Sequence, residues 1–167
     1  LDFFRVPSCN IETTNLFAQE FKKLNIKNPV VAAPDMGALG DAKNLAEKLN
    51  APVAYIIKTR KMHDKVASME ISGEVRSKDV LIFDDEIDTA GTICQAAQLI
   101  KSKGAKNIYV ACSHPVLSGS APERLKAAPI KKILATDTIP LTGEKQISKI
   151  SVISVAPLLA EAIKNIQ

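Results

Sequence analysis

Aromatic residues are scarce in this sequence: Trp is absent, and Phe and Tyr together make up 4% of the 167 residues. The core must therefore be built from aliphatic side chains, which supply most of the 46% of hydrophobic residues. Such a core suits an α/β layer fold, in which parallel strands are buried on both faces. No linker-like stretch divides the chain, so we expect a single domain over residues 1–167.

Long apolar runs and long basic runs are also missing. No stretch approaches the length that crosses a membrane, and no secretory signal pattern opens the sequence. The 22 basic and 18 acidic residues are interspersed, and a formal charge of +4 favours small anionic ligands over nucleic acid. The sequence therefore predicts a cytoplasmic protein that binds neither a membrane nor nucleic acid.

Cysteine is sparse, and its spacing excludes the common functional patterns. Cys9, Cys94 and Cys112 are odd in number and match neither a metal-binding nor a redox motif. We expect reduced thiols, with Cys94 on a helix and Cys112 on a strand packed as small hydrophobic side chains. This pattern argues against a cysteine nucleophile.

Strand-loop-helix units repeat along the chain. Helical periodicity predicts a first helix within residues 10–25 and a second over 39–49, and helices over 93–103, up to 125 and from 157. Short apolar runs predict strands at 30–33, 52–57, 67–73, 79–84, 107–113, 131–136 and 150–155. Residues 58–65 are basic and without apolar periodicity, and we expect a surface loop there. Alternation of this kind indicates a parallel β-sheet with helices on both faces.

One stretch, Val80–Thr92, carries the strongest functional signal. Asp84 and Asp85 follow a buried strand, and their carboxylates suit sugar hydroxyls or hydrated Mg²⁺. Residues 89–92 are small and lie where a helix begins, so their N–H groups favour a phosphate dianion, and Gly91 permits close approach or a positive φ. Together these features indicate a phosphorylated ribose as ligand. The alternative interpretation is an acidic turn before an ordinary helix cap.

The string from Val80 to Thr92 resembles the phosphoribosyl-diphosphate-binding motif of type I phosphoribosyltransferases and ribose-phosphate pyrophosphokinases. Five further stretches resemble the pyrophosphokinases specifically: residues 33–37, 57–61, 113–119, 136–140 and 154–163. The resemblance covers almost the whole chain and matches the C-terminal half of that family. It implies a type I phosphoribosyltransferase-like fold and, because the sequence does not begin with Met, we expect it to be part of something larger.

The resemblance also implies an activity and a set of site residues. The activity is transfer of diphosphate from ATP to ribose 5-phosphate, giving 5-phosphoribosyl diphosphate and AMP with Mg²⁺ as cofactor. Lys58 and Arg60 would be the catalytic cations. The residues implied to bind the sugar phosphate are Asp84, Asp85, Asp88, Thr89, Ala90, Gly91 and Thr92. Those implied to form the diphosphate loop are Asp35, Met36, Gly37 and Ala38, with Asp35 as the metal ligand.

The absent N-terminal half limits what this chain should do alone. In the family that half carries much of the ATP site and many subunit contacts, so we expect little kinase activity from the isolated chain and a homo-oligomer from the full-length form. Two alternatives stay open. One is a free-standing phosphoribosyltransferase, although no aromatic residue is well placed to stack on a nucleobase. The other is a non-catalytic regulatory relative of the pyrophosphokinases, although the acids and cations named above are all present.

Overall fold

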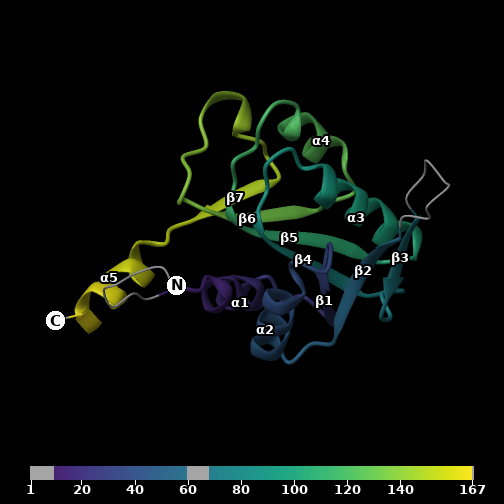
Figure 1. The fold of residues 1–167 in the computed structure, drawn as a ribbon, viewed down its shortest axis with the longest axis horizontal. Helices are drawn as coiled ribbons and strands as arrows, with labels where there is room; N and C mark the ends of the chain where they lie inside the picture. Colours follow the sequence, from purple (N-terminus) through teal and green to yellow (C-terminus); the bar gives the residue numbers. More distant parts are fainter. Residues whose placement is uncertain (1–9, 60–67, 167) are drawn as a thin grey trace.

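The protein is organised around one seven-stranded sheet, seen in Figure 1 in a computed structural model that describes residues 10–59 and 68–166. The strand order is β3-β2-β1-β4-β5-β6-β7. Neighbouring strands run parallel except β3, which pairs antiparallel with β2 at one edge. The strands are β1 (Pro29–Ala33), β2 (Val53–Thr59), β3 (Ser68–Ser72), β4 (Asp79–Glu86), β5 (Asn107–His114), β6 (Lys132–Thr136) and β7 (Ile150–Ile153).

Helices cover both faces of the sheet. In Figure 1, α1 (Thr14–Lys23) and α2 (Leu39–Leu49) lie together on one side, and α3 (Gly91–Ser102) and α4 (Ala121–Ala127) lie on the other. A short 3₁₀ turn spans Gly143–Lys145, and α5 (Ala156–Ile166) follows β7 and extends away from the sheet. The predicted α/β sheet with helices on both faces is therefore confirmed. No helix within the described ranges is long and apolar enough to cross a membrane.

Two aliphatic cores hold these layers together, one on each face of the sheet. Alternate residues of the central strand β4 enter opposite cores: Leu81 and Phe83 pack with α1 and α2, whereas Val80 and Ile82 pack with α3. Phe17 of α1 meets Phe83 edge to face, with ring centroids 5.7 Å apart. Because β4 is buried on both faces, its sequence is a continuous apolar run rather than an alternating one.

Both described cysteines are buried, as the sequence predicted. Cys94 lies on α3 and Cys112 on β5, and both are free thiols. Burial raises the pKa of the Cys112 thiol to about 12, so this group is a poor nucleophile near neutral pH. Cys9 lies outside the described residues.

One local expectation was wrong. Lys58 and Thr59, predicted to begin a surface loop over 58–65, continue β2 and pair with Met69 and Ser68 of β3, and residues 60–65 lie outside the described residues. Cross-strand pairing outweighs the polar character of this segment. Helix α1 starts at residue 14, within the predicted range 10–25, and the side chain of Thr13, which precedes it, makes no capping hydrogen bond among the described residues. Its hydroxyl instead lies 2.6 Å from the Ser113 hydroxyl of β5.

Candidate phosphate and sugar site

The candidate site lies where the strand order of the sheet reverses. From β1 the chain passes through α2 to β2 on one side, and from β4 it passes through α3 to β5 on the other. Ligands bind in open α/β sheets at such a switch point, outside the carboxyl ends of the strands. A cavity of about 180 Å³ opens there. Its lining residues are Asp35, Asp84 and the continuous segment 86–93.

The segment after β4 forms the wall that we call the phosphate loop, residues 88–92. It leads directly into α3, whose first N–H groups have no partner within the helix. Ala90 precedes the helix with φ of 60° and is 4% exposed. The structure therefore places the positive φ at Ala90 and not at Gly91, which is helical. A Cβ added to Gly91 would lie 3.8 Å from the Thr89 hydroxyl oxygen, which is an ordinary van der Waals contact, so Gly91 relieves no crowding there.

Asp84 is the half-buried carboxylate of this cavity. Burial, together with the negative charges of Asp85 and Asp35, raises its pKa to about 7. A carboxylate held in this way is stabilised in its ionised form by an added cation. Asp35, across the cavity on the loop after β1, accepts hydrogen bonds at Oδ1 from the N–H groups of Gly37 (3.0 Å) and Ala38 (3.3 Å). These bonds fold the segment 35–38 into a tight turn beside Asp84.

The cavity does not contain a complete set of metal ligands by itself. No three His, Cys, Asp or Glu side chains within the described ranges are arranged to hold an ion. Mg²⁺ nevertheless binds commonly through one or two carboxylates, with substrate phosphates and water completing its six ligands. Asp35 and Asp84 line one cavity, and the pKa of Asp84 is raised. These two carboxylates fit that mode of Mg²⁺ binding.

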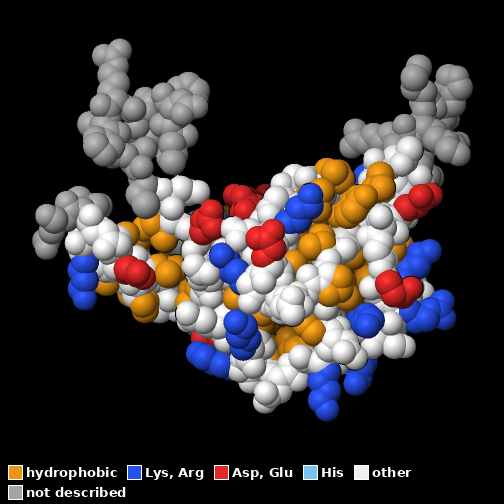
Figure 2. All heavy atoms as spheres, turned by 90° about the horizontal axis from the view of Figure 1, so that it is seen from below, with side chains coloured by type: hydrophobic (Ala, Val, Ile, Leu, Met, Phe, Trp, Pro, Cys, Tyr) orange, Lys and Arg blue, Asp and Glu red, His pale blue; other side chains and the backbone are white. Residues whose placement is uncertain are grey.

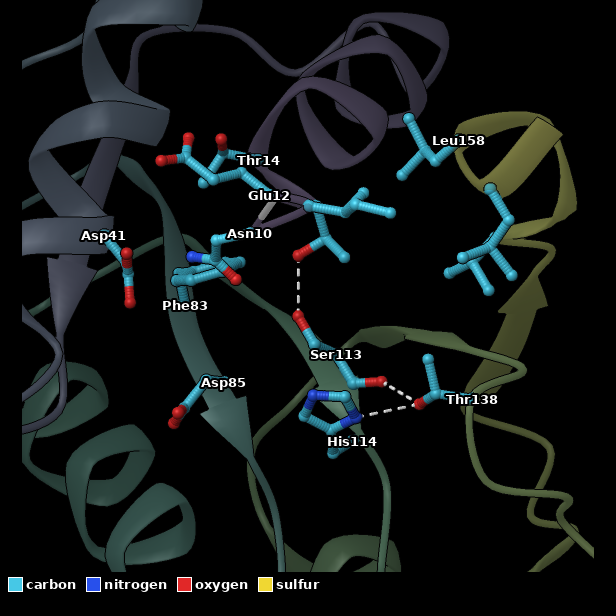
Figure 3. Close-up of a pocket in the computed structure, with 14 residues that line it drawn as sticks. Asn10, Glu12, Thr14, Asp41, Phe83, Asp85, Ser113, His114, Thr138 and Leu158 are labelled. Atoms are coloured by element: carbon cyan, nitrogen blue, oxygen red, sulfur yellow. Dashed lines mark hydrogen bonds between the residues drawn. The ribbon is translucent and has the colours of Figure 1, made fainter. Parts of the chain in front are cut away.

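Asp85 lines a different cavity from Asp84, although its carboxylate lies close enough to Asp84 to raise the pKa of that group. Together with Phe83, two residues earlier, it lines a second cavity of about 290 Å³ between the starts of α1, α2 and α5 (Figure 3). Asp41 of α2 faces it there, and burial together with Asp85 and Glu12 raises the pKa of Asp41. The structure thus divides the two adjacent acids between two cavities, although the sequence prediction had assigned both to the sugar.

Other polar groups of this second cavity are bound to one another. The His114 ring and the Thr138 hydroxyl lie 3.0 Å apart, and Thr138 also donates to the Ser113 carbonyl over 2.7 Å (Figure 3). Thr14 is 3% exposed, and its hydroxyl has no hydrogen-bond partner among the residues that the structure describes. Apolar side chains of α5 close one side, and hydrophobic atoms continue over that helix in Figure 2, where Leu159 and Ile163 are exposed.

Of the two predicted catalytic cations, Lys58 is among the described residues. Lys58 is exposed near the end of β2 and is absent from the described lining residues. Arg60 lies outside the described residues. Sequence reasoning missed Glu86, which lines the cavity, and Arg124 of α4, which donates from Nη1 to the carbonyl of Thr89 over 3.0 Å. No local pattern around residue 124 indicates a contact with a loop 35 positions earlier.

A helix N-terminus facing strand-end carboxylates at a switch point defines an open α/β protein with a candidate ligand site at the carboxyl ends of its strands. The family described as "Phosphoribosyl synthetase-associated domain" matches residues 49–167. The chain belongs to this family.

Relatives in sequence and structure agree with that assignment. The ribose-phosphate pyrophosphokinase of Halalkalibacterium halodurans is 43% identical over 98% of this chain and 52% of its own length. The crystal structure of phosphoribosylpyrophosphate synthetase from Mycobacterium smegmatis matches with a TM-score of 0.90 and 34% identity, over 99% of this chain and 54% of that one. The chain therefore spans about half the length of these relatives.

A more distant structure shares the fold alone. APRTase from Giardia lamblia matches with a TM-score of 0.62 at 18% identity, over 74% of this chain and 75% of that one. The predicted phosphoribosyltransferase-like fold and the resemblance to ribose-phosphate pyrophosphokinases are thus both confirmed.

Proposed function

We propose that this domain binds ribose 5-phosphate and Mg-diphosphate as one half of a ribose-phosphate pyrophosphokinase, which transfers diphosphate from ATP to ribose 5-phosphate and yields 5-phosphoribosyl diphosphate and AMP. The observation that carries the proposal is the shared cavity of the phosphate loop and the two strand-end acids, Asp35 and Asp84. A sugar phosphate has one dianionic end and several hydroxyl groups, and this cavity offers one matching surface to each.

Each part of the cavity has a distinct role in this proposal. The free N–H groups at the start of α3 and the hydroxyls of Thr89 and Thr92 bind the 5-phosphate. The carboxylates of Asp84 and Asp88 accept hydrogen bonds from ribose hydroxyls, since an ionised carboxylate is an acceptor only. Asp85 lines the second cavity and acts in this proposal through its negative charge beside Asp84.

The turn at residues 35–38 receives the diphosphate in the proposal. Asp35 would hold Mg²⁺, which when bound supplies positive charge to the diphosphate oxygens. The exposed backbone at Met36 and Gly37 lets the diphosphate approach closely. Lys58 and Arg60 would neutralise charge on the transferred group, because phosphoryl transfer depends mainly on positioning and electrostatics. The remaining half of the longer protein would complete the ATP site and contribute to a homo-oligomer.

Calorimetric titration with ribose 5-phosphate and Mg²⁺ tests the binding step. We expect saturable binding by the chain and loss of at least about tenfold in affinity in Asp84→Asn, because a charged acceptor is removed. Glu70→Gln, which removes an exposed charge from the edge strand β3, serves as the control and should bind normally. Absence of binding by the unaltered chain would overturn the proposal. Release of diphosphate from phosphoribosyl diphosphate on addition of a nucleobase would replace it with a phosphoribosyltransferase.

A further inference from the structure

The phosphate loop is held from behind by the segment that leads into α4. Three consecutive backbone carbonyls, those of residues 87, 88 and 89, each accept a hydrogen bond of 3.0 Å from this segment. The donors are Leu117 N, Ser118 N and Arg124 Nη1, in that order. None of these donor residues is among the described lining of the 180 Å³ cavity, so they contact the loop from its other side.

These contacts decide which way the peptide groups of the loop face. In a trans peptide the C=O and the following N–H point in opposite directions. When the carbonyls of residues 87–89 are bound behind the loop, the N–H groups of residues 88–90 point toward the cavity. A carbonyl turned into the cavity would instead repel an anion. The positive φ at Ala90 then brings the chain into α3, whose first N–H groups face the same side.

Arg124 is the one side chain among these three donors, and it also brings a charge. Its Nη1 atom lies 4.0 Å from the position that a Cβ on Gly91 would occupy, which places the guanidinium beside the first residue of α3. A guanidinium is ionised at any physiological pH. Burial raises the pKa of the Cys94 thiol in the first turn of α3, and the charge of Arg124 opposes that rise. Its field therefore reaches the helix N-terminus.

We propose that Arg124 is a positioning residue for phosphate binding: it fixes the Thr89 carbonyl behind the loop and adds positive charge beside the N-terminus of α3. This inference rests on the proposed function for the identity of the ligand. The hydrogen bond and the orientation of the loop, however, belong to the ligand-free protein and can be measured without any ligand.

The test compares Arg124→Gln, Arg124→Lys and Lys126→Gln. Lys126 lies on the same helix and its side chain is exposed, so its variant loses the same charge without touching the loop. Titrations use ribose 5-phosphate and, separately, inorganic phosphate. We expect Arg124→Gln to lower the affinity for each of these ligands by about tenfold. Lys126→Gln should change the two affinities by less than about twofold. Arg124→Lys should recover part of the loss, because it keeps the charge but not the planar fork of donors.

Amide hydrogen exchange of residues 86–93 without ligand provides the second readout. Arg124→Gln should speed exchange in this segment, with Lys126→Gln as the unaffected control. If the unaltered chain binds ribose 5-phosphate but Arg124→Gln binds it equally well, the positioning role is wrong and the proposed function stands. If the unaltered chain binds inorganic phosphate but not ribose 5-phosphate, the proposed function fails, and the affinities of the Arg124 and Lys126 variants for inorganic phosphate decide the positioning role. If it binds neither ligand, both the proposed function and the role of Arg124 in phosphate binding are overturned.

Discussion

Replacement of Asp84 by Asn should stabilise the folded protein at neutral and alkaline pH. The carboxylate is half-buried near two other acids, and its pKa is raised from 3.8 to about 7. The folded state therefore holds a proton that the unfolded chain releases at lower pH. Stability from this group is fully present below about pH 4 and is lost as the pH rises through about pH 7. Asn is neutral throughout and avoids that loss.

The size of the effect follows from the shift. At about 1.4 kcal/mol per pKa unit, the change from 3.8 to about 7 would correspond to about 4 kcal/mol. Solvent still reaches Asp84 and screens its charge, so we expect a gain of about 1–2 kcal/mol. The gain should grow between about pH 4 and about pH 7 and then remain constant.

Urea unfolding of the two proteins over this pH range, in the presence of a chelator, measures the difference directly. Glu70→Gln is the control, since it removes an exposed carboxylate from β3 and should show no comparable pH-dependent gain. A difference between Asp84→Asn and the unaltered chain that is independent of pH, or that favours the unaltered chain at about pH 8, would refute the reasoning. The same variant should lose ribose 5-phosphate binding, so stability would rise where function falls.

Three further predictions concern the packing around the sheet. Gly73 has φ of +108°, and an added Cβ would lie 2.8 Å from the Cβ of Ala54. Gly73→Ala should therefore lower the free energy of unfolding by about 2 kcal/mol or more. Gly40→Ala is the control and should not lower it, because a Cβ at Gly40 meets nothing within 4 Å. Thermal denaturation of the two glycine variants checks this, and equal losses would contradict it. Lys149 donates from Nζ to three carbonyl oxygens around the end of α4 at 2.7–3.0 Å. Lys149→Gln should therefore lower the free energy of unfolding in urea by about 1–3 kcal/mol. Lys103 is exposed, and Lys103→Gln should change this free energy little. Cys112 is fully buried, and the pKa of its thiol is about 12. Mass spectrometry after alkylation at about pH 8 should therefore find Cys112 modified only in urea. Rapid alkylation of Cys112 in the folded protein would contradict this prediction.

The sequence alone determined the layers of this protein and the position of its main loop. Buried strands in a parallel sheet are continuous apolar runs, and helices repeat their apolar residues every three or four positions, so both types of element could be predicted from local patterns. The string from Asp84 to Thr92 carries enough local chemistry to indicate a phosphate beside hydroxyl groups. Its description as strand, loop and helix agrees in order with β4 and α3, but β4 continues through Glu86 and so includes the acids that were predicted to follow the strand.

Only the tertiary structure decided how these residues are distributed in space. The pleat of β4 sends Asp84 and Asp85 to different cavities, and a motif written as adjacent letters does not reveal that separation. The strand pairing that extends β2 through Lys58 depends on β3, and the positive φ falls on Ala90 because of how the loop enters α3. Arg124 reaches the phosphate loop because α4 packs beside α3, a contact between residues 35 positions apart that no periodicity encodes. Local order follows from neighbouring residues, whereas the composition of a site follows from long-range packing.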